Sequence, residues 1–168
     1  MRRILSILCL AAIGFPAESA QPPRFDVLIR NARVMDGTGN PWLRADLGIS
    51  GDRIAAVGNL AAASAARTID ARDRIVAPGF IDVHSHAADG LRNPVLHQAQ
   101  PAIAQGVTTV VVNPDGGGPV DLAAQRAALE AARPGPNVAL LIGHGSVRSA
   151  VMGNARREPT ADELQKMK

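Results

Sequence analysis

Hydrophobic and polar positions follow two different patterns along the chain, and the change between them falls near Pro78. Residues 25–77 contain short runs rich in β-branched residues, separated by turn sequences such as Ser50-Gly51-Asp52. Runs of this kind predict brief strands joined by tight turns, with glycine where a positive φ is needed. A sheet unit of about fifty residues buries little apolar surface, so we expect it to accompany a larger unit.

After Pro78, strand-like and helix-like segments alternate. The strand-like segments are compact apolar runs, typical of parallel strands with both faces covered. Asn93 and Thr160 are candidate N-caps of two of the helices. The predicted strands are 79–83, 107–112 and 137–142, and the predicted helices are 93–105, 121–133 and a third that opens at Thr160. Three βα units in series predict an α/β fold with a parallel sheet or barrel.

The first twenty residues have the pattern of a secretory signal peptide. Arg2 and Arg3 precede an apolar run, residues 4–15, and small residues follow it. The run is too short to span a bilayer, which takes about 20 apolar residues. A buried first helix is the alternative, although the prolines after the run separate it from the following strands. We therefore predict that residues 1–20 direct export to the periplasm or medium and are then removed.

Composition and charge exclude several classes of protein. Apolar residues make up 46% of the chain and charged residues 20%, which excludes a disordered or acidic solvating segment. A net charge of +3, 2% aromatic residues and no tyrosine argue against nucleic acid as a partner. Cys9 is the single cysteine, which excludes a disulfide framework. After removal of the signal peptide we expect no membrane partner.

Candidate metal chemistry lies where the strand predicted at 79–83 ends. His84 and His86 follow it, and alternate residues of a strand face the same side. Two imidazoles at this spacing can bind one metal ion through their nitrogen atoms. Asp82 lies two residues before His84 and so faces the same side of the strand. There its carboxylate could accept a hydrogen bond from an imidazole N–H. The alternative is a polar strand end with two solvated histidines.

Five segments of the chain resemble segments of a known superfamily. They are residues 26–37, 51–58, 76–86, 106–112 and 143–153. The first two resemble the opening β-sandwich strands of the amidohydrolase superfamily, and the third resembles its metal-binding first barrel strand. The last two are similar to segments of its N-acyl-D-amino-acid deacylase (D-aminoacylase) group. The resemblance extends from about Phe25 to the last residue.

The resemblance implies an α/β fold in which a small β-sandwich domain is fused to a (β/α)8 barrel. Residues 21–77 correspond to part of the sandwich, and residues 78–168 correspond to the first three βα units of the barrel. A complete barrel takes about 250 residues, so we expect the chain to be the N-terminal part of a longer enzyme. A complete three-unit α/β protein is the alternative, although its parallel sheet would be left uncovered.

The resemblance also implies a reaction, the hydrolysis of an amide C–N bond by one or two zinc ions and a zinc-activated water. The implied substrate is a small N-acylated D-amino acid. His84 and His86 match the first ligand pair of the superfamily. Asp115 stands where these deacylases usually carry a metal-bridging cysteine, and we predict that it is a metal ligand; a solvated Asp-Gly turn is the alternative. The proton-transferring carboxylate is expected beyond Lys168, so the chain alone is expected to be inactive.

Two further residues are candidates for lining a substrate pocket. His144 ends the third predicted strand, where the resemblance favours a pocket role and a structural histidine is the alternative. Asp89 follows the histidine pair by three residues, and an Asp-Gly turn explains it equally well. The glycines after Asp115 lack the spacing and the lysine of a phosphate-binding P-loop.

Other functions are compatible with the same segments. Cyclic-amide hydrolases of the hydantoinase or dihydroorotase type and isoaspartyl dipeptidases are similar in this region, and they usually add a carboxylated lysine on a later strand. A barrel relative that has lost its metals is a non-enzymatic alternative. The presence of both His84 and His86 argues against that alternative.

Overall fold

The structure is a computed structural model that describes residues 22–168. The predicted signal peptide lies outside the described residues. The chain divides into two compact units between Ala77 and Pro78. Within residues 22–168, no helix combines the length and the apolar character needed to cross a bilayer.

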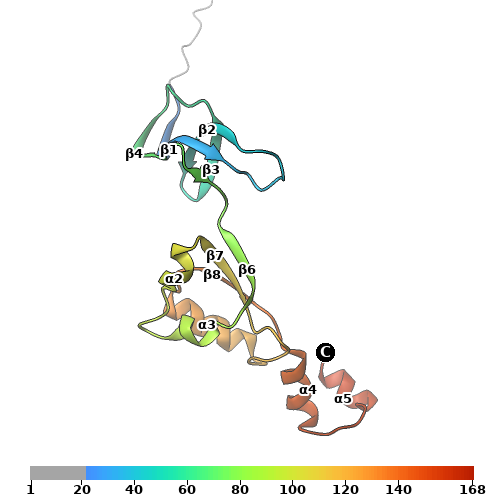
Figure 1. The fold of residues 1–168 in the computed structure, drawn as a ribbon. Helices are drawn as coiled ribbons and strands as arrows, with labels where there is room; N and C mark the ends of the chain where they lie inside the picture. The colour runs from blue at the N-terminus through green and yellow to red at the C-terminus, as the bar shows by residue number, and fades with distance from the viewer. Residues whose placement is uncertain (1–21) are drawn as a thin grey trace, which may run out of the picture. The chain divides into compact units, whose positions relative to one another are not determined.

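The N-terminal unit is a five-stranded mixed sheet with β1 at its centre (Figure 1). Its strands are β1 (Arg24–Val34), β2 (Leu43–Ser50), β3 (Arg53–Gly58), β4 (Ser64–Asp70) and β5 (Ile75–Val76). On one side β1 pairs antiparallel with β2, and β2 pairs antiparallel with β3. On the other side β4 and β5 pair parallel with the first and second parts of β1.

Two small apolar clusters stabilise this sheet. One contains Phe25 and Leu28, and the other contains Val34 and Leu47. The ring of Phe25 lies directly over Gly48, where an added Cβ would approach the ring to 2.5 Å. Gly48 therefore admits no side chain, and its small size allows the aromatic ring to pack flat against β2.

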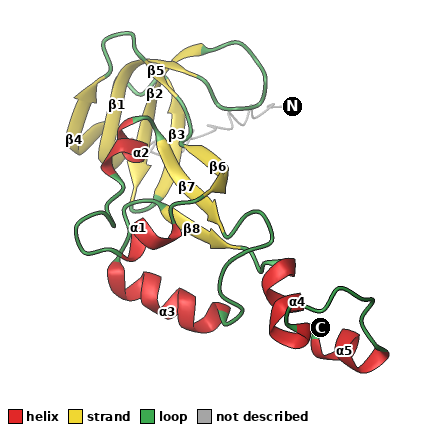
Figure 2. Ribbon diagram, turned by 60° about the horizontal axis from the view of Figure 1, so that its bottom comes forward, coloured by secondary structure: helices red, strands yellow, loops and turns green. Residues whose placement is uncertain are grey.

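The C-terminal unit alternates strands and helices, and its three strands are parallel in the order β6-β7-β8 (Figure 2). The strands are β6 (Phe80–Ser85), β7 (Val107–Val112) and β8 (Asn137–Leu140). The helices are α1 (Ala88–Arg92), α2 (Gln100–Ala104), α3 (Leu122–Ala132), α4 (His144–Met152) and α5 (Ala161–Lys166). This arrangement confirms the predicted α/β fold.

The core of the C-terminal unit lies between β7 and two helices. Val110 and Val112 of β7 pack with Leu91 of α1 and Leu129 of α3, and all four are buried. Both helices therefore cover the same face of β7. Strand β6 differs from the expectation of a strand covered on both faces, because Ile81 and Val83 are 61% and 70% exposed.

The predicted helix over residues 93–105 is wrong in its first part. Helix α1 already ends at Arg92, turns follow, and only Gln100–Ala104 form α2. The carboxamide oxygen of Asn93 accepts a hydrogen bond from the backbone N–H of Val95 at 2.8 Å. The N–H of His97 also donates to the backbone carbonyl oxygen of Asn93 at 2.9 Å, so Asn93 caps a single helical turn. Ala99 then has a left-handed φ of 44°, which interrupts the helix before α2.

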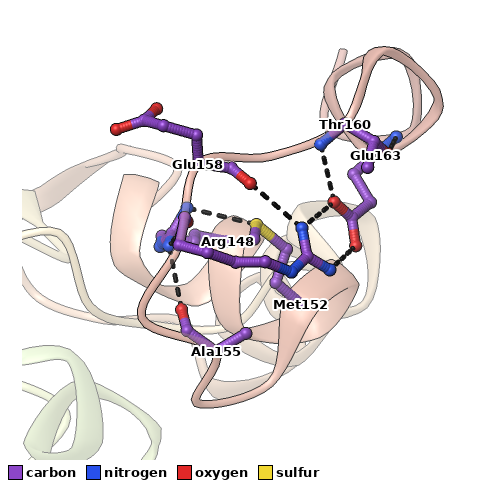
Figure 3. A network of polar contacts seen from close by, with 7 residues as sticks. Arg148, Met152, Ala155, Glu158, Thr160 and Glu163 are labelled. Atoms are coloured by element: carbon purple, nitrogen blue, oxygen red, sulfur yellow. Dashed lines mark hydrogen bonds and ion pairs between the residues drawn. The ribbon is translucent and has the colours of Figure 1, made fainter.

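Helices α4 and α5 are joined by a loop that one arginine side chain holds. Figure 3 shows Arg148 of α4 extending toward Met152 and Ala155. Its guanidinium donates to the backbone carbonyl oxygens of Ala155 at 3.0 Å and Arg157 at 2.8 Å. Two backbone carbonyl groups of the loop after α4 thus share one cation.

Thr160 is the N-cap of α5, as predicted, and it forms a capping box with Glu163. Thr160 accepts a hydrogen bond from the N–H of Glu163, and the Glu163 carboxylate accepts one from the N–H of Thr160. The same carboxylate receives two hydrogen bonds of 2.7 Å from the guanidinium of Arg157. These donors, Arg157 first and Thr160 next, lower the pKa of Glu163 from 4.5 to about 2.

We predict that this capping box persists in acid. Because the pKa of Glu163 is lower in the folded chain, its stabilising effect is complete above about pH 4.5 and is lost as the pH falls through about 2. An NMR titration of the Glu163 carboxyl carbon measures the midpoint. Replacement of Arg157 by alanine should move the midpoint upward. A midpoint at the ordinary value in the unchanged chain would contradict the prediction.

Candidate metal centre

Parallel strands bring the predicted ligands to one edge of the sheet. His84 is the last residue but one of β6, His86 follows that strand, and Asp115 lies in the loop after β7. Because β6 and β7 are parallel, their carboxyl ends and the loops that follow them meet at the same edge.

At that edge, the Asp115 carboxylate lies between two imidazoles. Its Oδ1 is 3.3 Å from Nε2 of His84, and its Oδ2 is 3.2 Å from Nε2 of His86. The centroids of the two rings are 5.4 Å apart. One donor atom from each residue lies within 4.8 Å of the other two, and all three side chains are exposed. The structure thus brings together the three residues predicted as metal ligands.

This donor set fits a zinc ion. Imidazole nitrogen and carboxylate oxygen both bind zinc at about 2.0–2.2 Å, and three protein ligands are usual in catalytic zinc sites. The two Nε2 atoms and the carboxylate already converge, so binding an ion requires small movements of side chains and no change of strand pairing. Imidazole and carboxylate donors also suit other divalent transition metals.

A β-bulge between Asp82 and Ser85 contains His84 and comes just before His86. Asp82 pairs with Val110 of β7, and Ser85 pairs with Val112. The chain therefore advances three residues along β6 where it advances two along β7. Such an extra residue bends a strand and changes the direction of its side chains. Ser85 is buried, whereas His84 and His86 on either side of it are exposed.

Asp82 does not make the predicted contact with an imidazole in the described structure. Its Oδ1 accepts a hydrogen bond from the backbone N–H of His84 at 3.1 Å. A bulge interrupts the ladder of hydrogen bonds between strands, and the carboxylate of Asp82 satisfies an N–H there. Its role is therefore to hold the backbone of His84.

An open pocket of about 340 Å³ is lined by two of the three donors. Its lining includes His86 and Asp115, together with Asp89 and Arg92 of α1. Asp89 forms an ion pair of 2.5 Å with Arg92 within that helix. Asp89 thus lies in the same pocket lining as His86, and its carboxylate already has a cationic partner. A larger cavity of about 620 Å³ between α3 and β8 includes none of the predicted site residues.

His144 does not lie at the end of a strand, in contrast to the prediction. Strand β8 ends at Leu140, and His144 is the exposed first residue of α4. Gly143 is the N-cap of that helix. His144 is not among the residues that line the pocket beside Asp115. The two glycines around it weaken the sequence signal for a helix, which explains why the sequence did not indicate α4.

Two buried amides near the donors were missed by the sequence analysis. Asn113 and Gln125 exchange hydrogen bonds and are almost fully buried. One signal was available for Gln125, because it lies three residues after Leu122 and four before Leu129. That spacing places a polar residue on the apolar face of α3.

A sequence profile of the amidohydrolase family matches residues 67–168, more than half of the chain. The chain belongs to the amidohydrolase family. The matched range contains the two histidines and the aspartate described above. Three relatives extend this result to particular amidohydrolases.

The N-acyl-D-glutamate deacylase of Alcaligenes xylosoxydans xylosoxydans is 39% identical over 170 residues, covering 86% of this chain and 34% of that enzyme. A solved structure of D-aminoacylase with a binuclear metal centre, in which one metal activates and a second attenuates, is 41% identical with a TM-score of 0.72. It covers 84% of this chain and 34% of that chain.

The third is the N-acyl-D-glutamate deacylase of Bordetella bronchiseptica, solved with zinc and a phosphonate mimic of the tetrahedral intermediate. It is 40% identical, has a TM-score of 0.72, and covers 86% of this chain and 35% of that chain. The matches confirm the resemblance to amidohydrolases and to their D-aminoacylase group. This amidohydrolase chain spans about a third of the length of the relatives it matches.

We predict that Asp115 is needed for metal binding. Asp115→Asn and Asp115→Ala should each lower the affinity for zinc at least tenfold, because loss of even an outer partner of a ligand typically costs about 10–100-fold. Competition with a chromophoric chelator measures the affinity. Asp89→Asn is a matched control, since it removes an exposed carboxylate from the same pocket without touching the three donors. Wild-type affinity in both Asp115 variants would show that Asp115 is only a turn residue.

Proposed function

We propose that the whole protein is a zinc-dependent amidohydrolase that removes the acyl group from N-acyl-D-amino acids. The observation that carries this proposal is the convergence of His84, His86 and Asp115 at the carboxyl ends of two parallel strands. Membership of the amidohydrolase family supports the hydrolytic reaction. The identity with an N-acyl-D-glutamate deacylase supports the class of substrate.

In this proposal the described residues form one side of the metal centre. His84 and His86 would hold the ion through their Nε2 atoms, and the bulge in β6 would keep both imidazoles on the open side of the sheet. When bound, zinc supplies a Lewis acid that acidifies water and polarises an amide carbonyl. The two oxygens of Asp115 face different imidazoles, which suits a carboxylate shared between two ions.

The pocket beside the donors would receive the substrate. Asp89 and Arg92 form an ion pair on its wall, which reduces the net charge that this wall presents to a substrate carboxylate. We propose that the proton-transferring group lies beyond Lys168, since the relatives are about three times as long as this chain. General acid–base catalysis by such a group typically contributes about 10²–10⁴-fold to the rate.

We predict that the full-length protein hydrolyses N-acetyl-D-amino acids faster than their L-enantiomers. Chelation should abolish turnover and zinc should restore it, while His84→Ala should reduce kcat/KM by at least about 10²-fold, the typical loss of a group that stabilises the transition state. Release of the free amino acid measures the rate.

Hydantoin and dihydrouracil are the comparison substrates for this experiment. Turnover of these cyclic amides without turnover of N-acetyl-D-amino acids would identify a cyclic-amide hydrolase instead. The 168-residue chain alone should release no amino acid above the level of its own His84→Ala variant. Clear turnover by that chain would contradict the placement of the proton-transferring group beyond Lys168.

We further propose that the protein is exported, on the basis of the pattern of residues 1–20. Expression with these residues should yield protein in the periplasm or medium that lacks them. Sequencing of its N-terminus measures the point of cleavage. An intact Met1 on folded protein in the cytoplasm would contradict export.

A further inference from the structure

Buried amides join the loop that carries Asp115 to α3 and to the residue after β8. From this we infer that Asn113 and Gln125 are positioning residues, which hold Asp115 where its carboxylate meets the two histidines. Neither amide belongs to the group of three donors, so each acts through the backbone of the loop. The inference rests on the proposed metal site and adds to it the means by which its third ligand is placed.

Three hydrogen bonds join the loop to α3 and to the end of β8. The Nδ2 of Asn113 donates to Oε1 of Gln125 at 2.9 Å and to the carbonyl oxygen of Leu141 at 2.8 Å. In return, Nε2 of Gln125 donates to Oδ1 of Asn113 at 3.1 Å. Asn113 is 7% exposed and Gln125 is 4% exposed. Because a buried amide without partners is costly, this arrangement is strongly favoured over one in which the loop moves away.

The backbone of the loop needs such support. Asn113 has φ of 65° and Asp115 has φ of 60°, and Gly116 and Gly118 also have positive φ. Residues with a side chain enter this region at a cost, and asparagine and aspartate do so more readily than others. A conformation of this kind persists where surrounding contacts determine it. The amide pair makes those contacts two residues before the ligand.

The other side of the loop packs against the start of α4. The carbonyl oxygen of Gly116 accepts a hydrogen bond from the backbone N–H of Ser146 at 3.1 Å. An added Cβ on Gly143 would lie 2.4 Å from that same oxygen, so the two backbone segments are in direct contact. Asp115 is therefore held between the amide pair on one side and the first turn of α4 on the other.

A pair of variants and a matched control test this inference by zinc affinity in the full-length protein. Gln125→Met keeps the approximate volume and removes both hydrogen bonds, and Asn113→Gly keeps access to a positive φ and removes the amide. Each should lower the affinity for zinc by about 10–100-fold, the usual effect of a lost outer partner of a ligand. The absorption spectrum of bound Co²⁺ should change in both, because a displaced carboxylate alters the ligand geometry.

Leu129→Ala is the matched control, since Leu129 is buried one turn further along α3 and belongs to the apolar cluster with Leu91, Val110 and Val112. It should lower thermal stability and leave zinc affinity and the Co²⁺ spectrum close to wild type. The inference is overturned if both amide variants bind zinc as wild type does, or if Leu129→Ala loses as much affinity as they do. Wild-type protein that binds no zinc would overturn the proposed metal site itself.

Discussion

The parallel pairing of β6 with β7 sets the position of every group in the candidate metal centre. Backbone hydrogen bonds place Asp82 opposite Val110 and Ser85 opposite Val112. A slip of one residue would turn each side chain of β7 to the opposite face and would expose the two valines that α1 and α3 cover. Apolar packing on the helix side of the sheet therefore fixes the register on which the histidines at its edge depend.

The contacts at the edge itself are too weak to do this. The side chains of Asp115 and the two histidines are more than half exposed, and exposed ion pairs contribute only about 0–1 kcal/mol. Leaving a buried amide such as that of Asn113 without a partner costs about 1–3 kcal/mol. The buried hydrogen bonds behind the loop, and the close contact of Gly143 with Gly116, thus outweigh the attraction between Asp115 and the imidazoles.

Features with a local cause were predictable from the sequence. The apolar run of β7 has the predicted bounds, and α3 lies within the predicted range 121–133, with Asp121 and Arg133 as its caps. The spacing of the two histidines and the place of Asp115 after the next strand indicated the three donors, because parallel strands end at one edge. These signals need only periodicity, cap chemistry and strand direction.

Features that depend on a partner segment were not predictable in the same way. The bulge in β6 exists only relative to β7, and it gives Asp82 a backbone partner in place of an imidazole. Helix α4 begins between two glycines and gains its first-turn contact from Gly116 of a distant loop. Gln125 could be noticed on the apolar face of α3, but its partner Asn113 lies in a different element.

The donor set of the candidate centre contains nitrogen and oxygen and no sulfur. Thiolates are the groups that peroxide, disulfides and alkylating agents attack first, and imidazole and carboxylate resist them. The single cysteine of the chain, Cys9, lies in the predicted signal peptide. Ligands of this kind hold their metal equally well in oxidising and reducing surroundings, so this side of the centre would need no reductant to keep it intact outside the cytoplasm.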